Sequence, residues 1–442
     1  MSVHEDVRTR SGVRGAGARY ASSLKRLAAL LVTAPLLSGC ILTYLLPLPS
    51  TATRSSPAPI VPPSPGPSAS PLALIKGTVL GGAPAAAVWN LIDTASIHAS
   101  RWESGGGLQA LFDVPRLEMS PNLASSVRVS VSPLGNRFLV TEYVTVGGQF
   151  LDSVRIVDVN GHVLWARQLK TQATEFRWSP NGTRVAMDLR GHWLILTFHD
   201  RGAPTVSEVP TARPKNVNGS FTNPWMLVGF SADGRWLYGG DALGGSLPFR
   251  VTVRASVLNG KVERIARLPT DVKGRLAFPP SFDSSRVEQT IDPGTGRVVT
   301  GSCGVGDACN VSVWGENKAV AFDLPTRSAS FSSAWHRGSL IALWTRGVPG
   351  QQKLHLSRFS LREGDLGKVS DISTFPEGST ASFAGLADGW VMLAYGTGAQ
   401  TGQAELVLVR LADGGLSVVQ SSPDVAASEM FGFAGWLPDN AT

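Results

Sequence analysis

The side chains of this sequence that could do chemistry are few: three cysteines and seven histidines in 442 residues. Histidine is the usual side chain for acid–base catalysis near neutral pH and for metal binding. His192 and His199 lie seven residues apart on one expected strand, so they face opposite sides of a sheet. The chain has no His-x-x-x-His, His-Glu-x-x-His or Gly-x-Ser-x-Gly motif. We therefore expect no metal site, no cofactor and no catalytic centre, and we predict that the protein is not an enzyme.

Two of the cysteines are close enough in sequence to react with each other. Cys303 and Cys309 are separated by Gly-Val-Gly-Asp-Ala. Such a pair can close a small hairpin loop in an oxidising compartment, and no histidine or further cysteine lies nearby to complete a zinc site. We predict a Cys303–Cys309 disulfide. Because its loop is short, it would fix local geometry more than it would raise global stability.

The third cysteine closes a segment with the character of an export signal. Residues 1–26 carry six basic and two acidic side chains, and residues 27–53 carry no charge. The apolar run contains four residues in a recognisable order, namely Leu37, Ser38, Gly39 and Cys40. This order resembles the lipobox of bacterial lipoproteins, whose cysteine is acylated before the signal peptide is cut. The resemblance implies that residues 1–39 are a signal peptide and that a lipid on Cys40 holds the protein at the membrane, outside the cytoplasm.

A second form of anchoring fits the same residues. After Cys40 the chain stays apolar, whereas mature lipoproteins usually turn polar at once. The uncharged stretch from Leu27 to Leu48 has the length of about 20 residues that a helix needs to span a bilayer. An uncleaved signal anchor that ends near residue 48 is therefore the alternative to lipidation. Both alternatives export the remainder of the chain.

Residues 40–72 are a linker rich in proline and serine, with nine prolines between residues 47 and 71. Such a segment cannot bury a core and forms an extended, semi-rigid spacer. The full chain has 40 basic and 33 acidic residues, and residues 1–39 hold six and two of these. The remaining 34 basic and 31 acidic residues nearly balance, so the exported part has no electrostatic signature of a nucleic-acid-binding protein.

A repeat of about 51 residues organises the sequence between residue 120 and the C-terminus. Each copy consists of an apolar strand end, a Ser-Pro/Ala-x-Gly turn and a new apolar run. Glycine supplies the positive φ that such a turn needs, and proline presets the residue after serine. The turn residues of the three clear copies are Ser132 with Gly135, Ser179 with Gly182, and Ser231 with Gly234. Fainter copies occur at Ile291–Gly294, Trp335–Gly338, Gly385–Gly389 and Trp436–Asp439.

Four short strands fit within one repeat. After the strand that ends at Trp178, three more are expected at Thr183–Leu189, His192–His199 and Pro204–Val209. The turn between the third and fourth strands recurs as Asn160-Gly161, Asn259-Gly260 and Asp413-Gly414, which favour tight hairpins. Repeated units of this kind predict an all-β protein, a β-propeller of four-stranded blades over residues 73–442. We predict seven blades, with six as the alternative.

The last copy of the repeat leaves too little chain for a full blade. Its turn at Trp436 lies six residues before the end of the sequence, so three strands of that blade must come from elsewhere. Residues 75–125 contain apolar runs at Ala85–Ile92 and Leu108–Val114 and are the natural donors. We therefore expect both chain ends to close the ring within one blade.

The repeat resembles that of the TolB-like and WD40-like propellers common among exported bacterial proteins, over about 310 residues. A lipobox followed by such repeats is also loosely similar to the propeller part of LpqB-like actinobacterial lipoproteins, whose family acts with a sensor kinase at the envelope. The segment Val157–Trp165 resembles a quinoprotein-type repeat, but it occurs once clearly and is interpreted as strand, turn and strand. A sialidase-type Ser-x-Asp-x-Gly box begins at Ser231 and Asp233 and fails because Arg235 replaces its glycine.

These observations favour a membrane-anchored extracytoplasmic propeller that serves as a protein-interaction or scaffold module of the bacterial cell envelope. Its expected partners are the membrane and an envelope protein, and nucleic acid is not among them. The alternative is a small-ligand-binding, hydrolytic or quinoprotein-type propeller with its site in the central channel. Fold alone does not separate the two.

Overall fold

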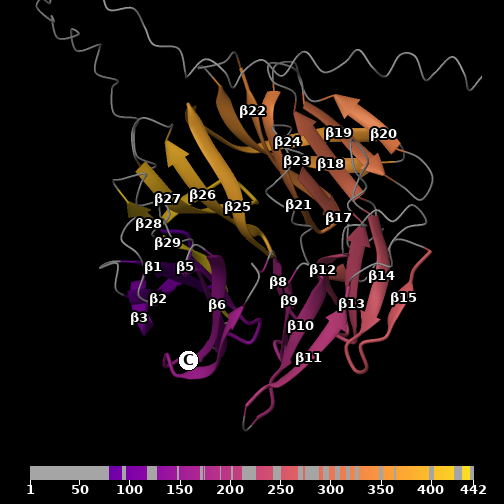
Figure 1. The fold of residues 1–442 in the computed structure, drawn as a ribbon. Coiled ribbons are helices and arrows are strands. Elements are labelled where there is room, and N and C mark those ends of the chain that lie inside the picture. The colour runs from indigo at the N-terminus through magenta and orange to yellow at the C-terminus, as the bar shows by residue number, and fades with distance from the viewer. Residues whose placement is uncertain are drawn as a thin grey trace, which may run out of the picture. The chain divides into compact units, whose positions relative to one another are not determined.

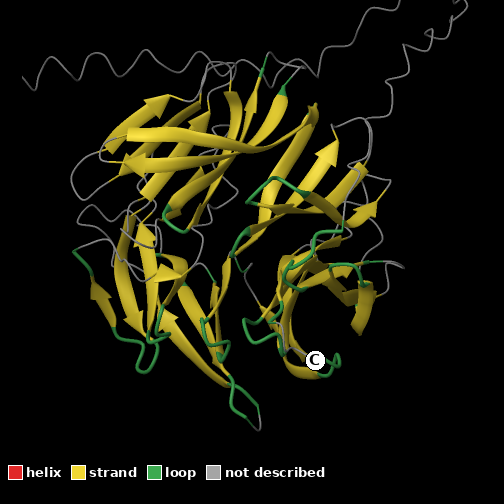
Figure 2. Ribbon diagram, turned by 180° about the vertical axis from the view of Figure 1, so that it is seen from behind, coloured by secondary structure: helices red, strands yellow, loops and turns green. Residues whose placement is uncertain are grey.

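The computed structural model describes residues 79–91, 96–116, 127–146, 149–169, 173, 175–189, 191–200, 203–211, 225–241, 250–266, 272–273, 288–291, 298–303, 309–314, 319–323, 328–347, 352–362, 365–397, 403–422 and 431–438. The chain divides into two compact units, residues 1–69 and 70–442, and the described residues lie in the second. All their regular elements are strands (Figure 2). None of these residues belongs to a helix that is long and apolar enough to cross a bilayer. The predicted signal peptide, the lipobox and the linker lie outside the described residues.

The described strands form seven antiparallel sheets, which follow one another in chain order (Figure 1). Sheet 1 contains β29 (Phe431–Trp436), β1 (Ala86–Asn90), β2 (Ser96–Glu103) and β3 (Gly107–Pro115). Sheet 2 contains β4 (Val127–Val131), β5 (Arg137–Val146), β6 (Gln149–Asp158) and β7 (Val163–Leu169). Sheet 3 contains β8 (Glu175–Trp178), β9 (Arg184–Asp188), β10 (His192–Thr197) and β11 (Thr205–Pro210). Sheet 4 contains β12 (Met226–Ser231), β13 (Trp236–Asp241), β14 (Arg250–Ser256) and β15 (Val262–Arg264), with β16 (Val272–Lys273) on the other edge of β12.

The remaining three sheets have the same order of strands. Sheet 5 contains β17 (Glu288–Ile291), β18 (Val298–Cys303), β19 (Cys309–Trp314) and β20 (Ala319–Asp323). Sheet 6 contains β21 (Ser328–His336), β22 (Ser339–Arg346), β23 (Lys353–Arg362) and β24 (Asp365–Glu377). Sheet 7 contains β25 (Ser379–Ala387), β26 (Trp390–Thr397), β27 (Gln403–Arg410) and β28 (Leu416–Ser422). The prediction of an all-β propeller is confirmed, and the number of blades and the closure of the ring stay predictions.

Several middle strands, β10 among them, are apolar on both faces, and this pattern determines how their sheets pack. In β10, Leu194 and Leu196 point into a core shared with sheet 2, and Trp193 and Ile195 point into a core shared with sheet 4. All four side chains are fully buried. Because successive side chains of a strand alternate between its faces, a sheet of this kind needs a neighbour on each side. The hydrophobic effect therefore acts mainly between sheets rather than within one.

Sheet 1 is assembled from both ends of the described chain. β29 pairs with β1 in antiparallel register, with Trp436 opposite Ala86 and Phe431 opposite Asn90. The expected donor segment supplies β1 and β3 and also β2, which the apolar runs in the sequence did not reveal. β29 also packs against β4 of sheet 2 and β25 of sheet 7. The last strand of the domain thus contacts β1 and β4, about 300 residues or more before it in the chain, and also β25 of the sheet that precedes it.

The tight turns between third and fourth strands pack on the preceding sheet. Gly161, between β6 and β7, lies against Phe112 of β3, and Gly414, between β27 and β28, lies against Ile372 of β24. A Cβ atom at position 414 would collide with the Ile372 carbonyl oxygen, and its φ of 73° is one that other residues rarely adopt. The Asn-Gly and Asp-Gly pairs of the sequence are therefore needed for contact between sheets as well as for the turn itself.

One carboxylate in the core between sheets 6 and 7 has an unfavourable environment. Glu405 of β27 is 4% exposed and lies opposite Tyr395 of β26. Its Oε2 atom has no hydrogen-bond partner among the described residues. Burial raises the pKa of Glu405, and it also raises the pKa of Tyr395, which is hydrogen-bonded to Ser379. The folded protein therefore holds a proton on Glu405 at a pH where the unfolded chain has released it.

We predict that Glu405→Gln stabilises the protein at neutral and alkaline pH. Below the ordinary glutamate pKa of about 4.3 both states are protonated and the penalty is absent. As the pH rises above that value, ionisation in the unfolded state lowers the free energy of unfolding of the wild type. The amide cannot ionise, so the variant keeps this stability, a gain of about 1–3 kcal/mol.

Urea unfolding at pH 5 and pH 8 measures the effect, with the exposed Glu208→Gln on β11 as the matched control. The difference in the free energy of unfolding between Glu405→Gln and the wild type should be larger at pH 8 than at pH 5. The control variant should show no such dependence on pH. A variant that is less stable than the wild type at pH 8 would show that the carboxylate is stabilised by a partner.

Candidate functional site

The repeated serines form the same buried turn in three sheets. Ser132, Ser179 and Ser231 are each 0% exposed, and each follows or ends the first strand of its sheet. The Ser179 hydroxyl accepts a hydrogen bond from the Arg184 amide at 2.9 Å and donates one to the Asn181 side chain at 2.7 Å. The Ser179 carbonyl accepts the Gly182 amide at 2.8 Å. One side chain thus satisfies a buried backbone group and fixes the course of the chain into the second strand.

The other two copies repeat these contacts with different partners. The Ser132 hydroxyl accepts the Arg137 amide at 3.3 Å and donates to Asn136 at 3.0 Å. The Ser231 hydroxyl accepts the Trp236 amide at 3.0 Å and donates to Asp233 at 2.6 Å. That hydrogen bond is the main reason why the pKa of Asp233 is lowered. Asp233 is thus held by its own turn, which agrees with its interpretation as a turn residue rather than a sialidase-type acid.

The turns of neighbouring sheets touch one another. Leu134 of the turn in sheet 2 packs against Gly182 of sheet 3, whose φ is 65°, and Gly234 of sheet 4 lies next to Ser179. Between sheets 6 and 7 the link is an ion pair of Arg337 with Asp388. We call these turns, residues 132–137, 179–184, 231–236, 336–339 and 387–390, the turn rim. Its backbone is fixed by hydrogen bonds while several of its side chains are exposed.

The contact between Arg337 and Asp388 includes an unusual backbone conformation. Arg337 has a φ of 46°, the one positive φ of a non-glycine residue in the described part of the chain. His336 Nε2 lies 3.7 Å from the other Asp388 oxygen. Burial lowers the pKa of His336, an effect that Asp388 opposes. A bulky residue in the left-handed region costs about 1–2 kcal/mol of conformational free energy. The turn of sheet 6 holds Arg337 in this unfavourable conformation, in which its side chain pairs with Asp388 of sheet 7.

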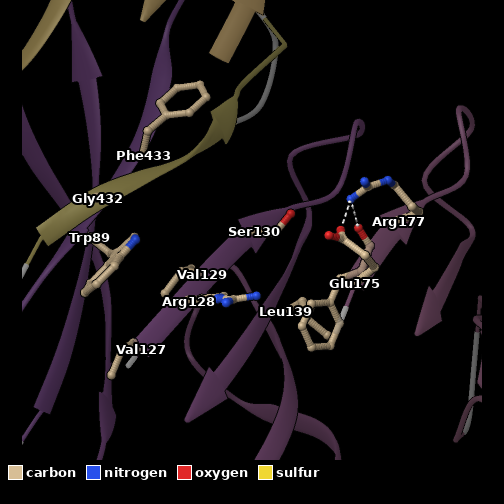
Figure 3. Close-up of a pocket in the computed structure, with 11 residues that line it drawn as sticks. Trp89, Val127, Arg128, Val129, Ser130, Leu139, Glu175, Arg177, Gly432 and Phe433 are labelled. Carbon is tan, nitrogen blue, oxygen red and sulfur yellow. Dashed lines mark hydrogen bonds and ion pairs between the residues drawn. The ribbon is translucent and has the colours of Figure 1, made fainter. Parts of the chain in front are cut away.

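A cavity of about 350 Å³ lies between the first strands of sheets 1, 2 and 3 (Figure 3). Sheet 1 lines one side with aromatic and small residues, and sheet 3 lines the other with charged and aromatic residues. β4 runs between the two sides. The lining residues are Trp89, Val127, Arg128, Val129, Ser130, Leu139, Glu175, Phe176, Arg177, Gly432 and Phe433. We call this space the central cavity.

The charged side chains of the central cavity are not equivalent. Arg177 Nη1 pairs with Glu175 at 2.7 Å and also bonds the Phe176 carbonyl, and its Nε donates to the Val228 carbonyl at 3.0 Å. Arg128 is exposed, and its guanidinium makes no hydrogen bond with the residues that the structure describes. Figure 3 shows Arg128 extending from β4 toward the side where Glu175 lies. One arginine is thus used to hold the structure, and the other is available to a ligand.

Glu175 is a half-buried carboxylate between two arginines. Burial raises its pKa, an effect that Arg177 and Arg128 oppose and that Asp188 reinforces. Asp188 itself accepts the Leu227 amide at 2.8 Å and so joins sheet 3 to sheet 4. Glu175 pairs directly with Arg177, and Arg128 is a second cation whose charge acts on the same carboxylate.

A serine, an aspartate and a histidine do meet in sheet 6, but not in a catalytic order. The Ser357 hydroxyl donates to Asp371 at 2.6 Å and accepts from the Trp344 indole at 2.9 Å. His355 stacks on Trp344, and its Nδ1 is 4.0 Å from Asp371. A nucleophilic serine needs a histidine that accepts its proton. Here the fully buried Ser357 hydroxyl instead donates its hydrogen bond to the Asp371 carboxylate. No group of three possible metal ligands occurs among the described residues.

The predicted disulfide lies where the backbone is described and the side chains are not. Cys303 ends β18 and Cys309 begins β19, and the two residues are paired directly opposite each other. Opposite residues of antiparallel strands have Cα atoms about 4.5–5.5 Å apart, within the range that a disulfide spans. The bond itself stays a prediction, as does the lipid on Cys40, which lies outside the described residues.

The central cavity was not predicted from the sequence. Arg128, Glu175 and Arg177 are charged residues within short strands, and Trp89 lies in an apolar run that predicts only a core strand. Charged side chains in a first strand were the available signal, since that strand borders the centre of a propeller. That these charged side chains line one cavity with Trp89 and Phe433 depends on the packing of three different sheets, which the spacing of residues in the sequence does not reveal. The strand predicted for 192–199 also ends earlier, at Thr197, so His199 lies beyond it.

Comparison with known proteins finds distant structural similarity and no close relationship. No protein-family profile matches the chain, and no curated protein matches it in sequence. Solved structures with similar folds include prolyl oligopeptidase B from Galerina marginata, with 12% identity and a TM-score of 0.44 over 77% of this chain and 51% of that one. The chain thus spans about half the length of that peptidase.

Two further solved structures contain propellers. TolB from Acinetobacter baumannii has 12% identity and a TM-score of 0.28 over 64% of each chain. The β-propeller domain of the trilobed protease from Pyrococcus furiosus has 11% identity and a TM-score of 0.37, over 66% of this chain and 98% of that domain. These likenesses are in fold alone. The similarity to LpqB-like lipoproteins stays a prediction from the sequence.

Proposed function

We propose that this protein is a lipid-anchored, extracytoplasmic β-propeller that binds a protein of the bacterial cell envelope through its turn rim. The lipobox at Leu37–Cys40 and the basic residues before it support the anchor. The proline-rich residues 40–72 would hold the propeller away from the membrane, where a partner can reach it.

The turn rim is the observation that carries the interaction. In sheets 2, 3 and 4 its backbone is fixed by the buried serines and the neighbouring turns are in contact, so this part of the surface is ordered before any partner arrives. Leu134 is 47% exposed in this rim, and charged side chains such as Arg235 and Asp388 lie on other turns of it. A preordered surface loses little conformational entropy on binding, which favours specific association.

We predict that Cys40→Ala removes the lipid anchor. The thioether to the lipid requires the Cys40 sulfur, so the variant should lose incorporation of a labelled fatty acid and, because the cut follows acylation, should keep residues 1–39. Intact-mass measurement gives the N-terminus in both proteins. Cys303→Ala is the matched control, because it removes a cysteine of the predicted disulfide and should leave both the lipid and the cut N-terminus unchanged.

A contrary result would support the second anchor. If the wild-type protein incorporates no fatty acid and keeps residues 1–39, residues 27–48 form a signal anchor. The lipid part of the proposal would then be wrong, while the export of the propeller would stand.

We predict that a photo-crosslinking amino acid at Leu134 or Arg235 captures one envelope protein in intact cells. The same amino acid at Val206 should not, because Val206 is 41% exposed on the outer strand β11, two strands away from β9, where the turn 179–184 ends. Arg235→Glu should reduce the adduct formed from position 134 by about fivefold or more if its charge contributes to the contact. Mass spectrometry of the adducts is the measurement. Equal adducts from positions 134 and 206, or none from either rim position, would contradict binding through the turn rim.

A further inference from the structure

We infer that β4 binds an extended peptide segment of a partner protein along its inner edge, so that the segment adds a strand to sheet 2 inside the central cavity. The inner edge of a first strand is the edge that faces away from the second strand of its sheet. This site goes beyond the proposed binding through the turn rim, because it uses backbone groups of β4 rather than side chains of turns. It requires neither the lipid nor the partner of the turn rim.

Consecutive residues of first strands line the central cavity. They are residues 127–130 of β4, 175–177 of β8 and 432–433 of β29. Side chains of consecutive residues point to opposite faces of a strand. Four consecutive residues of β4 can therefore line one cavity only along their shared backbone, and the cavity borders the edge of this strand. Figure 3 shows this part of β4 between Gly432 and Glu175.

The register of β4 shows which of its backbone groups can accept another strand. The Ser132 amide donates to the first carbonyl of β5 at 2.8 Å, so Ser130 and Arg128 also bond to β5. The amides and carbonyls of Val127 and Val129 point the other way, toward the inner edge. Sheet 2 begins at β4, so no strand among the described residues pairs with this edge. A row of such groups is a template for strand addition.

The corresponding edge of sheet 4 already holds an added strand. β16 lies antiparallel on the inner edge of β12, with Lys273 opposite Phe230. Phe230 has the place in its repeat that Val131 has in β4, since each directly precedes the serine of its turn. A strand added to β4 would thus copy a pairing that the fold already contains.

β4 also has more space beside it than other first strands. First strands of adjacent sheets pack closely at β29 and β4, at β8 and β12, and at β21 and β25, whereas β4 and β8 pack less closely. The cavity of about 350 Å³ lies here. Arg177 partly covers the neighbouring edges, because it donates to the Phe176 carbonyl of β8 at 2.8 Å and to the Val228 carbonyl of β12 at 3.0 Å. The edge of β4 is open to the cavity.

The side chains of β4 predict the composition of the added segment. Residues directly opposite each other in neighbouring strands point to the same face. Val127 and Val129 belong to the core shared with sheet 1, so a residue opposite either of them meets an apolar side. Arg128 and Ser130 point to the other face, where the charge of Arg128 acts on Glu175. Two of the three charged side chains that line the cavity are arginines. A segment of alternating apolar and acidic residues fits both faces.

The probe is a fluorescein-labelled octapeptide in which valine and glutamate alternate, and fluorescence anisotropy measures its binding to the full-length protein in lipid nanodiscs. In antiparallel register the valine opposite Val129 donates its amide to β4, and the glutamate amides point away. N-methylation of the valines should therefore weaken binding about tenfold or more, and N-methylation of the glutamates less than about threefold. The two methylated peptides have the same composition and charge.

A charge reversal tests the side-chain part of the inference. The wild type should bind the valine–glutamate peptide about fivefold more tightly than a valine–lysine peptide, and Arg128→Glu should reverse this order. Arg167→Glu is the matched control, because Arg167 is an exposed arginine on β7 outside the cavity and should leave the order unchanged. A general loss of structure would weaken both peptides and cannot reverse their order.

Three outcomes would overturn strand addition by a partner. The first is equal binding of the two N-methylated peptides, and the second is an unchanged order of the charged peptides in Arg128→Glu. The third is binding only to a variant that lacks residues 49–70, which would show that the linker of this chain occupies the edge. Failure of every peptide to bind at about 100 μM would also contradict the inference. No envelope partner is present in these measurements, so they are independent of binding through the turn rim.

Discussion

Sheets 1, 2, 3, 6 and 7 of this protein each share a core with a neighbour on both faces, so each has to be covered on two sides. Leu194 and Trp193 are neighbours on β10, and both are fully buried, but they belong to cores on opposite faces of sheet 3. The same alternation occurs in β1, where Ala87 joins a core with sheet 2 and Val88 a core with sheet 7. A single sheet with two apolar faces would expose one of them to water, so none can be stable alone. Sheets 1 to 4, and likewise sheets 5, 6, 7 and 1, are therefore joined by shared cores.

This constraint explains why the last strand pairs with the first. Without β29, sheet 1 would lack the strand that packs on both β4 and β25, and the cores on its two faces would open at that point. It also explains where the functional surfaces lie. Packing between sheets buries the faces of the strands. The surfaces that stay accessible to a partner are therefore the turns and the edges of the first strands. The turn rim and the central cavity are these two surfaces.

Much of the fold could be predicted from the sequence because its signals are local. A serine, a proline or alanine and a glycine specify one turn, and the pairs Asn160-Gly161 and Asp413-Gly414 specify another. These turns recur at a fixed spacing, which is enough to predict four-stranded units and a propeller. β2 was missed because its apolar residues Ile97 and Ala99 alternate with polar ones, although that alternation is itself the signal of a half-buried strand.

The sites depend on contacts that spacing does not encode. Arg337 and Asp388 lie in equivalent turns one repeat apart, yet nothing in either turn predicts that they form an ion pair. Arg128, Trp89 and Glu175 line one cavity only because three sheets pack side by side. The repeat thus predicts the scaffold, while side chains that differ between copies of the repeat produce the sites.

The most direct measurement of the central claim is hydrogen exchange on Leu194→Ala, with the exposed Val206→Ala of the same sheet as the control. Leu194 is fully buried in the core shared by sheets 2 and 3. If stability resides between sheets, the variant should lose about 2–5 kcal/mol, and amides of β5 and β6 should lose protection together with those of β9 and β10. The control should change protection in neither sheet. A loss of protection confined to sheet 3 would contradict the account, because it would show that each sheet is stabilised by itself.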